Sequence, residues 1–297
     1  MLDIKVIEQD ELGKVSSFIA ELNQHEESHI GFCGKEQDEI ADCMKNDMDD
    51  INYTDSFIVA YEGNELVGVL GFDADFENSN AEIWGPFIVP RKWDIVYDMW
   101  NEMTGLLTSE IDSLEMFPNL KNERACQFAK AVSFEKHSDE SILTFRNDRH
   151  ELKSDFIEEM TPTYYDDMKQ LHDEAFPGAY YSGQQIIKRL DEDNKVFIKT
   201  NDGVLIGYIY VEVEPKFGDG SIEFFAVKES EKGRGVGKEL LTGALKWLFT
   251  YETIQSITLC VNSTNASAIN LYKKAGFQHQ HDLCSFTKNL KTSSAIN

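Results

Sequence analysis

The stretch Lys232-Gly233-Arg234-Gly235-Val236-Gly237, followed at once by Lys238-Glu239-Leu240-Leu241, decides how this chain is interpreted. It lies between a predicted strand, residues 222–227, and a predicted helix whose leucines and alanines recur at helical spacing. Its glycines leave backbone N–H groups accessible to a pyrophosphate. The positive end of the helix and the side chains of Lys232, Arg234 and Lys238 add attraction for an anion. The stretch therefore predicts a phosphate-binding loop.

Spacing decides which kind of phosphate loop is meant. A Walker A loop requires Gly-x-x-x-x-Gly-Lys-Ser/Thr, but Glu239 follows Lys238 here. A dinucleotide-binding fingerprint requires a third glycine where Lys238 stands. The remaining pattern is basic-x-x-Gly-x-Gly after a strand, which is similar to the loop that acyl-CoA-dependent N-acyltransferases use for the CoA pyrophosphate. An ordinary glycine-rich turn stays open as an alternative.

A second motif lies downstream of a predicted strand at residues 256–261. It reads Asn265-Ala266-Ser267-Ala268-Ile269-Asn270-Leu271-Tyr272-Lys273-Lys274-Ala275-Gly276-Phe277. Together the two segments resemble the GCN5-related N-acetyltransferases (GNAT superfamily), whose second signature is Asn-x-x-Ala-x-x-Leu-Tyr-x-x-x-Gly-Phe. Lys232 departs from the family's Arg or Gln at the head of the loop, a change that keeps the charge.

The resemblance implies an acetyl-CoA-dependent enzyme that transfers the acyl group directly to a primary amine in a ternary complex. The backbone of Phe225, Ala226 and Val227 would hold the pantetheine arm, and the Val227 N–H would face the thioester oxygen. Other expected contacts to the acyl donor come from the loop and from the second motif: Lys232, Gly233, Arg234, Gly235, Val236, Gly237, Lys238, Asn265, Ala268 and Tyr272. No metal is expected.

Two side chains are candidates for proton transfer. Tyr272 is the candidate general acid, since a phenol stays protonated at neutral pH and can protonate the departing thiolate. The alternative is a core tyrosine bonded to a backbone carbonyl. Glu223 is the candidate general base, because strand alternation places it on the face of Phe225 and Val227 beside aromatic neighbours. The alternative is a solvated carboxylate.

An internal repeat predicts two tandem domains. Asn122 to Phe134 matches Asn265 to Phe277 at Asn, Ala and Phe, and Phe87-Ile88-Val89 corresponds to Phe225-Ala226-Val227. The first half has Pro90 to Ile95 in place of the glycine loop and Ala129 in place of Tyr272. We therefore expect a degenerate GNAT-like domain without CoA at 1–150 and an active domain at 151–297, with an unrelated α/β first domain as the alternative.

The expected fold class is α/β (α+β), with each domain built on a mixed, mostly antiparallel central sheet flanked by helices. In the second half we predict helices at 162–176 and 182–190, a hairpin of residues 196–199 and 205–211, and closing strands within 279–288. A turn is predicted at 218–220, a polar join at 147–154 and a loose tail at 291–297.

Charge differs between the halves. Residues 1–150 hold 12 Lys and Arg against 32 Asp and Glu, which accounts for 20 of the 25 net negative charges. This acidity predicts a cationic acceptor, a small molecule or a peptide, that approaches across the first domain; solubility alone is the alternative. No basic stripe suggests nucleic acid. We expect a cytoplasmic monomer or weak homodimer without a membrane segment. A non-catalytic acyl-CoA sensor or a protein-interaction module stays open.

One motif points to another class of enzyme. His25-Glu26-Glu27-Ser28-His29 fits His-Glu-x-x-His, which on a helix would place two imidazoles on one face for zinc. The following Ile30-Gly31-Phe32 breaks the helical pattern and supplies no third ligand. These residues are therefore expected to be solvated at the end of the first helix or to line a groove between the domains. His279 and His281 are expected to be surface histidines on one face of a strand.

Overall fold

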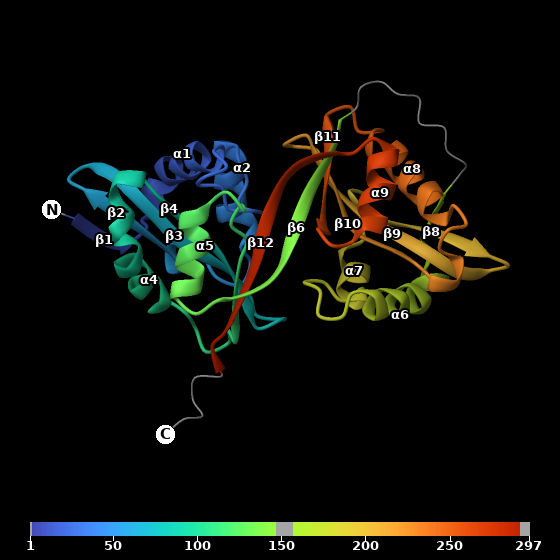
Figure 1. Cartoon of the computed structure of the whole chain (residues 1–297), viewed down its shortest axis with the longest axis horizontal. Helices are drawn as coiled ribbons and strands as arrows, with labels where there is room; N and C mark the ends of the chain where they lie inside the picture. The colour runs from blue at the N-terminus through green and yellow to red at the C-terminus, as the bar shows by residue number, and fades with distance from the viewer. Residues whose placement is uncertain (1, 147–156, 292–297) are drawn as a thin grey trace. The chain divides into compact units, whose positions relative to one another are not determined.

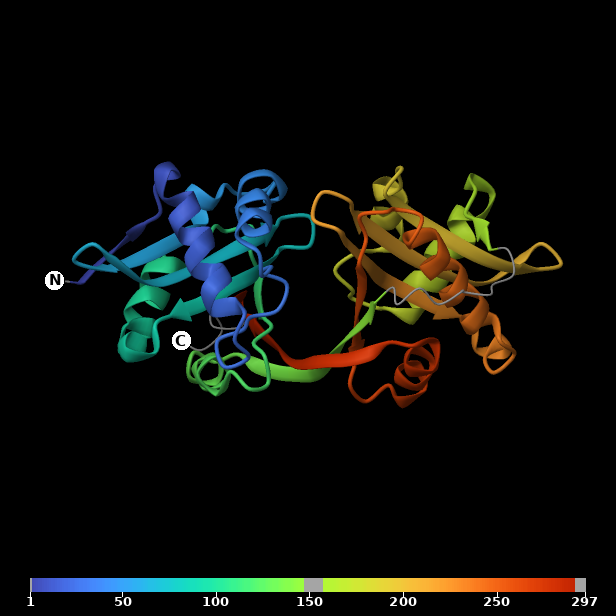
Figure 2. The ribbon, with the colours of Figure 1, turned by 90° about the horizontal axis from the view of Figure 1, so that it is seen from above.

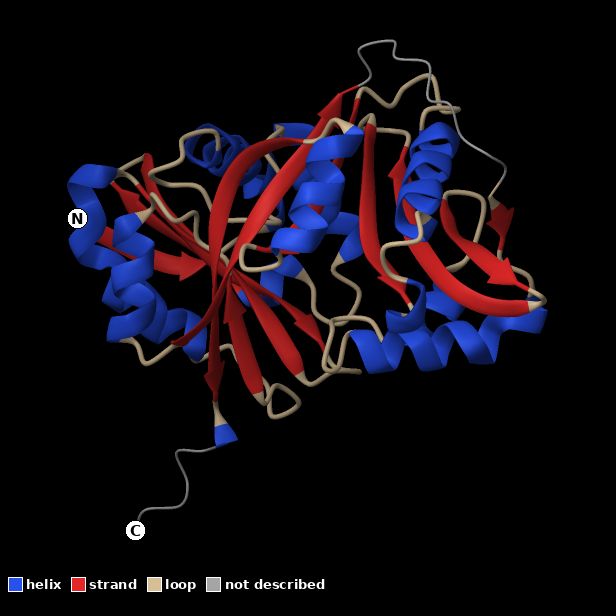
Figure 3. Ribbon diagram, turned by 45° about the vertical axis from the view of Figure 1, so that its right-hand side comes forward, coloured by secondary structure: helices blue, strands red, loops and turns tan. Residues whose placement is uncertain are grey.

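A computed structural model of the chain describes residues 2–146 and 157–291, and the chain divides into two compact units. The first consists of Met1–Glu140 and His281–Asn297, and the second of Ser141–Gln280. In each unit, helices cover a mixed sheet, as Figure 3 shows in red and blue. The expected α/β fold class is confirmed.

The first unit has the sheet order β1-β2-β3-β4-β5-β12-β6. Helix α1 packs on one face of this sheet and α4 and α5 on the other, and Figure 2 shows α1 crossing its face. The elements are β1 (Leu2–Val6), η1 (Gln9–Glu11), α1 (Leu12–Asn23), α2 (Gln37–Asp42), η2 (Cys43–Asp47), α3 (Tyr53–Ser56), β2 (Phe57–Glu62), β3 (Glu65–Asp75), β4 (Asn80–Ile88), η3 (Pro90–Ile95), α4 (Val96–Thr104), β5 (Ser113–Met116), α5 (Glu123–Ala131) and β6 (Glu135–Arg146).

The second unit has the order β12-β6-β11-β10-β9-β8-β7. Helices α6 and α7 pack on one face of the sheet and α8 and α9 on the other (Figure 1). The elements are β7 (Glu158–Glu159), η4 (Pro162–Tyr164), α6 (Tyr165–Ala175), α7 (Gly183–Arg189), β8 (Asn194–Asn201), β9 (Val204–Glu214), β10 (Asp219–Val227), η5 (Glu229–Glu231), α8 (Val236–Leu248), β11 (Ser256–Asn262), α9 (Ala266–Ala275) and β12 (Gln278–Asn289).

The units differ from the contiguous halves 1–150 and 151–297. Strand β6 begins in the first unit and ends in the second, whereas β12 begins in the second and ends in the first. Cys284 and Phe286 of β12 are buried in the core of the first unit, and Leu143 and Phe145 of β6 in that of the second. The buried apolar residues of each long strand therefore belong to the core of the unit in which the strand ends.

The repeat has a matched geometry. Asn122 caps α5 by accepting a hydrogen bond from the Ala125 N–H at 3.1 Å, and Asn265 caps α9 by accepting one from Ala268 N–H, also at 3.1 Å. The sheet register corrects the sequence match by one residue. Ile88 pairs with Gly68 as Val227 pairs with Gly207, so Pro86, Phe87 and Ile88 are the counterparts of Phe225, Ala226 and Val227.

Most predicted elements of the second unit are confirmed, including the helices at 162–176 and 182–190 and the hairpin. Two details were wrong. The turn before β10 covers 215–218, and residues 279–288 form one long strand instead of several. The predicted polar join at 147–154 and most of the tail at 291–297 lie outside the described residues. Across 2–146 and 157–291, no helix is long and apolar enough to cross a membrane.

The His-Glu-x-x-His segment is not helical. Helix α1 ends at Asn23, and His25 to Ser28 form a turn beyond it. His29 is buried, so the expectation that it is solvated is wrong. Its ring centroid lies 4.5 Å from that of His281, which is half-buried. Within the described ranges, no group of three or more His, Cys, Asp or Glu side chains is placed to hold a metal ion.

Candidate active site

Strand β10 has an open edge in its second half. It pairs with β11 in parallel only from Asp219 to Ile222, whereas its antiparallel pairing with β9 continues to Val227. Over the described residues, the backbone of Phe225, Ala226 and Val227 therefore has no ladder partner on the β11 side. Unpaired backbone groups of this kind can accept an extended ligand as an additional strand.

The glycine loop follows this edge directly. Gly233 and Gly235 have φ angles of +78° and +92°, and Gly235 is the N-cap of α8. A Cβ built on either residue would meet no atom within 4 Å. Both glycines therefore serve the backbone conformation and leave open space in front of the first turn of α8, where its free N–H groups point.

Gly237 has a different role from the other two glycines. A Cβ at this position would lie 3.3 Å from both Leu271 Cδ2 and Phe225 Cζ. It therefore lets α8 approach β10 and α9 closely, and it does not widen the space for phosphate. The expectation that all three glycines clear the loop for pyrophosphate is corrected at this position.

The cationic side chains of the loop form only local ion pairs. Lys232 lies 2.5 Å from Glu229, and Arg234 lies 3.2 Å from Glu231. The Lys232 and Arg234 side chains are largely exposed, and exposed pairs of this kind stabilise by less than about 1 kcal/mol. Both cations can therefore turn to a phosphate at small cost, and Lys238 is also exposed on the first turn of α8.

Tyr272 lies on α9 with its ring buried against the sheet. Its ring centroid is 6.3 Å from that of Phe225 and 5.7 Å from that of Phe277. Among the described residues, no group accepts a hydrogen bond from its hydroxyl, so a core tyrosine bonded to a carbonyl is not observed. Burial raises the pKa of Tyr272 above its usual range. The phenol is therefore a protonated donor beside the open edge of β10.

The other two predicted residues of the second motif, Asn265 and Ala268, have structural roles. Asn265 uses its side-chain oxygen as the helix cap, which leaves its amide NH₂ for another partner. Ala268 is half-buried and packs against the apolar cluster that contains Tyr272 and Leu240. The small side chain of Ala268 keeps this face of α9 close to the core.

Glu223 occupies a β-bulge, where the register of β10 against β9 shifts between Ile222 and Phe224. Because the bulge breaks the alternation, Ile222 and Phe225 pack on the α8 side while Phe224 packs on the α6 side. Glu223 accepts a hydrogen bond from Tyr180, which lies in the loop between α6 and α7. The argument from alternation, which placed it with Phe225 and Val227, is therefore wrong.

Burial raises the pKa of Glu223 above its usual range, and the negative charge of Glu212 raises it further. Hydrogen bonds from Ser221 and Tyr180 act in the opposite direction, because they stabilise the carboxylate. Glu223 is therefore a carboxylate poised to accept a proton nearer neutral pH than an exposed glutamate.

An aromatic and acidic group that is not among the residues predicted from the sequence surrounds Glu223. The Tyr180 ring lies 4.8 Å from the Phe224 ring, between centroids. Tyr210 donates a hydrogen bond to Glu212 at 2.5 Å, and Arg189 stacks on Tyr181 at 4.4 Å. The signal was the alternation of Tyr208, Tyr210 and Glu212 along β9, which shows that these side chains share one face.

The first unit lacks this arrangement at the corresponding positions. A 3₁₀ turn, η3, begins at Pro90 where the second unit has η5 and the glycine loop, and no residue from Pro90 to Ile95 is a glycine. Ala129 lies buried at the position that corresponds to Tyr272.

Residues 157–277 match the model of the Acetyltransferase (GNAT) family. A mycothiol acetyltransferase of Streptomyces avermitilis is 32% identical over 88 residues, which are 29% of this chain and 28% of that protein. An N-alpha-acetyltransferase of Sulfurisphaera tokodaii is 32% identical over 92 residues, 28% of this chain and 55% of that protein. The chain thus covers less than two thirds of either relative.

Two solved structures resemble the whole chain in fold. A GCN5-related N-acetyltransferase from Sphaerobacter thermophilus has a TM-score of 0.74 at 12% identity, over 97% of this chain and 95% of that one. A tandem GNAT protein from the clavulanic acid biosynthesis pathway has a TM-score of 0.65 at 13% identity, over 97% and 98%. The two units together therefore have the tandem GNAT fold.

Proposed function

From the match of residues 157–277 to the model of the Acetyltransferase (GNAT) family, we propose that the second unit transfers an acyl group, most simply acetyl, from acyl-CoA to a primary amine. One observation carries the proposal. The open backbone edge Phe225 to Val227 leads directly into a loop with two left-handed glycines, and the unbonded phenol of Tyr272 lies beside that edge. A site that bound acyl-CoA without catalysis would not need a phenol as a proton donor.

The residues divide the work of direct transfer in a ternary complex. The open edge positions the pantetheine arm, and the loop with the α8 N-terminus binds the pyrophosphate. The amine nitrogen attacks the thioester carbon, and the Val227 N–H stabilises the oxyanion that forms. Collapse breaks the C–S bond, and Tyr272 gives its proton to the thiolate. Glu223 accepts one proton from the acceptor's ammonium group through a water molecule before the attack and later releases it to solvent. The second proton, which the nitrogen loses as the amide forms, returns to the Tyr272 phenolate.

The acceptor, in this proposal, is an amine that is cationic in solution. Glu223 supplies negative charge on the α6 side of the sheet, and the rings of Tyr180 and Phe224 lie beside it. The neighbouring Glu212 is paired with Arg189, whose Nε lies 3.5 Å from its carboxylate. Aromatic faces and carboxylates together attract an ammonium group. Glu223 then removes the proton that makes this group non-nucleophilic.

The test of the proposed function is release of the CoA thiol from acetyl-CoA with a panel of amines, namely polyamines, aminoglycosides, amino acids and peptides. We expect turnover with at least one primary amine and none with its N-acetylated form. Binding of acetyl-CoA without turnover on the whole panel would favour the sensor instead.

The raised pKa of Glu223 predicts a specific pH dependence. Activity requires the carboxylate, so kcat/KM should fall as the pH drops through the pKa of Glu223. Tyr180→Phe removes a hydrogen bond that lowers this pKa, and the acidic limb should therefore move to higher pH. Glu223→Gln should abolish the limb and lower kcat about 100-fold or more, the typical contribution of general acid–base catalysis.

Tyr97→Phe, which removes an exposed hydroxyl in the first unit, is the matched control and should leave the profile unchanged. An acidic limb that persists in Glu223→Gln would assign the proton acceptor to another group.

A further inference from the structure

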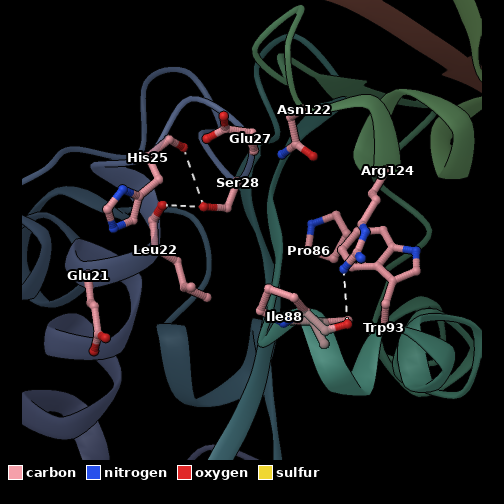
Figure 4. Close-up of a pocket in the computed structure, with 11 residues that line it drawn as sticks. Glu21, Leu22, His25, Glu27, Ser28, Pro86, Ile88, Trp93, Asn122 and Arg124 are labelled. Atoms are coloured by element: carbon pink, nitrogen blue, oxygen red, sulfur yellow. Dashed lines mark hydrogen bonds between the residues drawn. The ribbon is translucent and has the colours of Figure 1, made fainter.

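The first unit contains a cavity that the proposed reaction does not use. Its volume is about 490 Å³, within the roughly 300–1,000 Å³ of typical small-molecule sites. Figure 4 shows the residues that line it. They come from α1 and the turn after it, from the end of β4, from η3 and from the start of α5: Glu21, Leu22, His25, Glu27, Ser28, Pro86, Ile88, Pro90, Trp93, Asn122 and Arg124.

The cavity lies at the counterpart of the open edge of β10, because Pro86 and Ile88 correspond to Phe225 and Val227 by sheet register. The chemistry differs, however. Pro86 has no N–H to offer a pantetheine arm, and η3 offers no glycine for a pyrophosphate. The space therefore suits a ligand smaller than CoA that is bound by side chains.

One wall of the cavity carries an exposed cation. Arg124 donates one hydrogen bond to the Pro90 carbonyl at 3.0 Å, and its guanidinium carbon lies 5.8 Å from the Trp93 ring centroid. Among the described residues it forms no ion pair, although the chain has 53 Asp and Glu. Four of its five N–H donors stay free to bind a carboxylate in a fork.

The opposite wall carries negative charge. Glu21 and Glu27 line the cavity, and neither forms an ion pair with another described residue. Ser28 donates a hydrogen bond to the Leu22 carbonyl at 2.5 Å, which holds the turn that presents Glu27. Figure 4 shows these glutamates on the side away from Arg124, with the apolar residues Pro86 and Ile88 on the Arg124 side.

We propose that this cavity binds a small zwitterion with an apolar body, such as a short peptide. Its carboxylate would bind Arg124, its ammonium group would lie at the wall that carries Glu21 and Glu27, and its side chains would lie against Ile88, Trp93 and Leu22. A ligand with only a positive or only a negative charge would leave the charged side chains of one wall without a partner. The site would therefore bind such a ligand more weakly than a zwitterion.

The test uses calorimetry on the full chain with leucyl-leucine and glycyl-phenylalanine, each compared with its C-terminal amide and its N-acetyl form. We expect one site per chain for a free dipeptide, and affinity at least about tenfold weaker for each capped form, as the loss of a charge-assisted hydrogen bond implies. Absence of binding by both free dipeptides, or equal binding of the capped forms, overturns the proposal.

Two variants locate the site. Arg124→Gln should remove the preference over the amide, and Glu21→Gln with Glu27→Gln should remove the preference over the N-acetyl form. Arg91→Gln, which removes an exposed arginine paired with Glu65, is the charge-matched control and should change neither. Binding that is lost in Glu223→Gln and kept in Arg124→Gln would place the peptide at the acceptor site instead and overturn the proposal.

Discussion

Gly235→Glu should abolish acyl-CoA binding, with a loss of at least about 100-fold. Gly235 caps α8 at φ +92° and faces open space, so the new carboxylate would stand where the pyrophosphate binds. Two unit charges about 4 Å apart repel by about 1 kcal/mol in water and about 4 kcal/mol near a protein surface, and the second value alone exceeds a hundredfold change. Calorimetric titration with acetyl-CoA measures the effect.

Gly203→Glu is the control for the backbone strain that a glutamate has at a positive φ. Gly203 lies in the turn between β8 and β9 at φ +77°, and a Cβ there also meets no atom within 4 Å. This control has the same cost in backbone strain, about 1–2 kcal/mol, and should bind acetyl-CoA as the unmodified chain does.

The same titration should show that the unmodified chain binds one acetyl-CoA. Binding that survives Gly235→Glu would mean that the loop has been misassigned.

The glycine loop between β10 and α8 could be predicted from the sequence because it depends on local chemistry. Glycines that can adopt a positive φ are visible in the residue types themselves, and Gly233 and Gly235 adopt one. The Asn265 cap of α9 is not among the predictions, although asparagine is a preferred helix cap. Phosphate binding by the loop stays a prediction.

The position of Glu223 could not be predicted in the same way. Alternation along a strand holds only while the register is regular, and the single extra residue at the bulge reverses the faces on either side of it. The residue types at 222–227 do not predict a bulge, because the position of the bulge is set by pairing with β9. Tyr180 as the partner of Glu223 follows from the same tertiary contact.

The exchange of strands between the units could also not be predicted from the sequence. Strands β6 and β12 are each 12 residues long, and in each a polar N-terminal part is followed by the apolar residues that suit a core. Sequence order favours contiguous domains, so a division near residue 150 was the natural prediction. Only the burial of Phe286 and Phe145 shows which core receives the apolar part of each strand.

Tyr272→Phe should lower kcat by at least about tenfold and leave the affinity for acetyl-CoA nearly unchanged. The substitution keeps the buried ring against Phe225 and Phe277 and removes only the hydroxyl. General acids contribute about 10²–10⁴-fold, and part of this is kept if water can reach the thiolate. Single-turnover rates are the measurement, because they report chemistry and not product release.

Stability separates this role from a structural one. A hydroxyl with a buried partner contributes about 1 kcal/mol to folding, whereas the Tyr272 hydroxyl has no partner among the described residues, so its removal should leave the unfolding midpoint unchanged or higher. Tyr251→Phe is the control, since that hydroxyl donates to the Glu192 carbonyl at 2.9 Å outside the site. It should leave the single-turnover rate unchanged. A Tyr272→Phe protein with normal single-turnover rates and a lowered midpoint would make Tyr272 a core residue, and the thiolate would then take its proton from solvent.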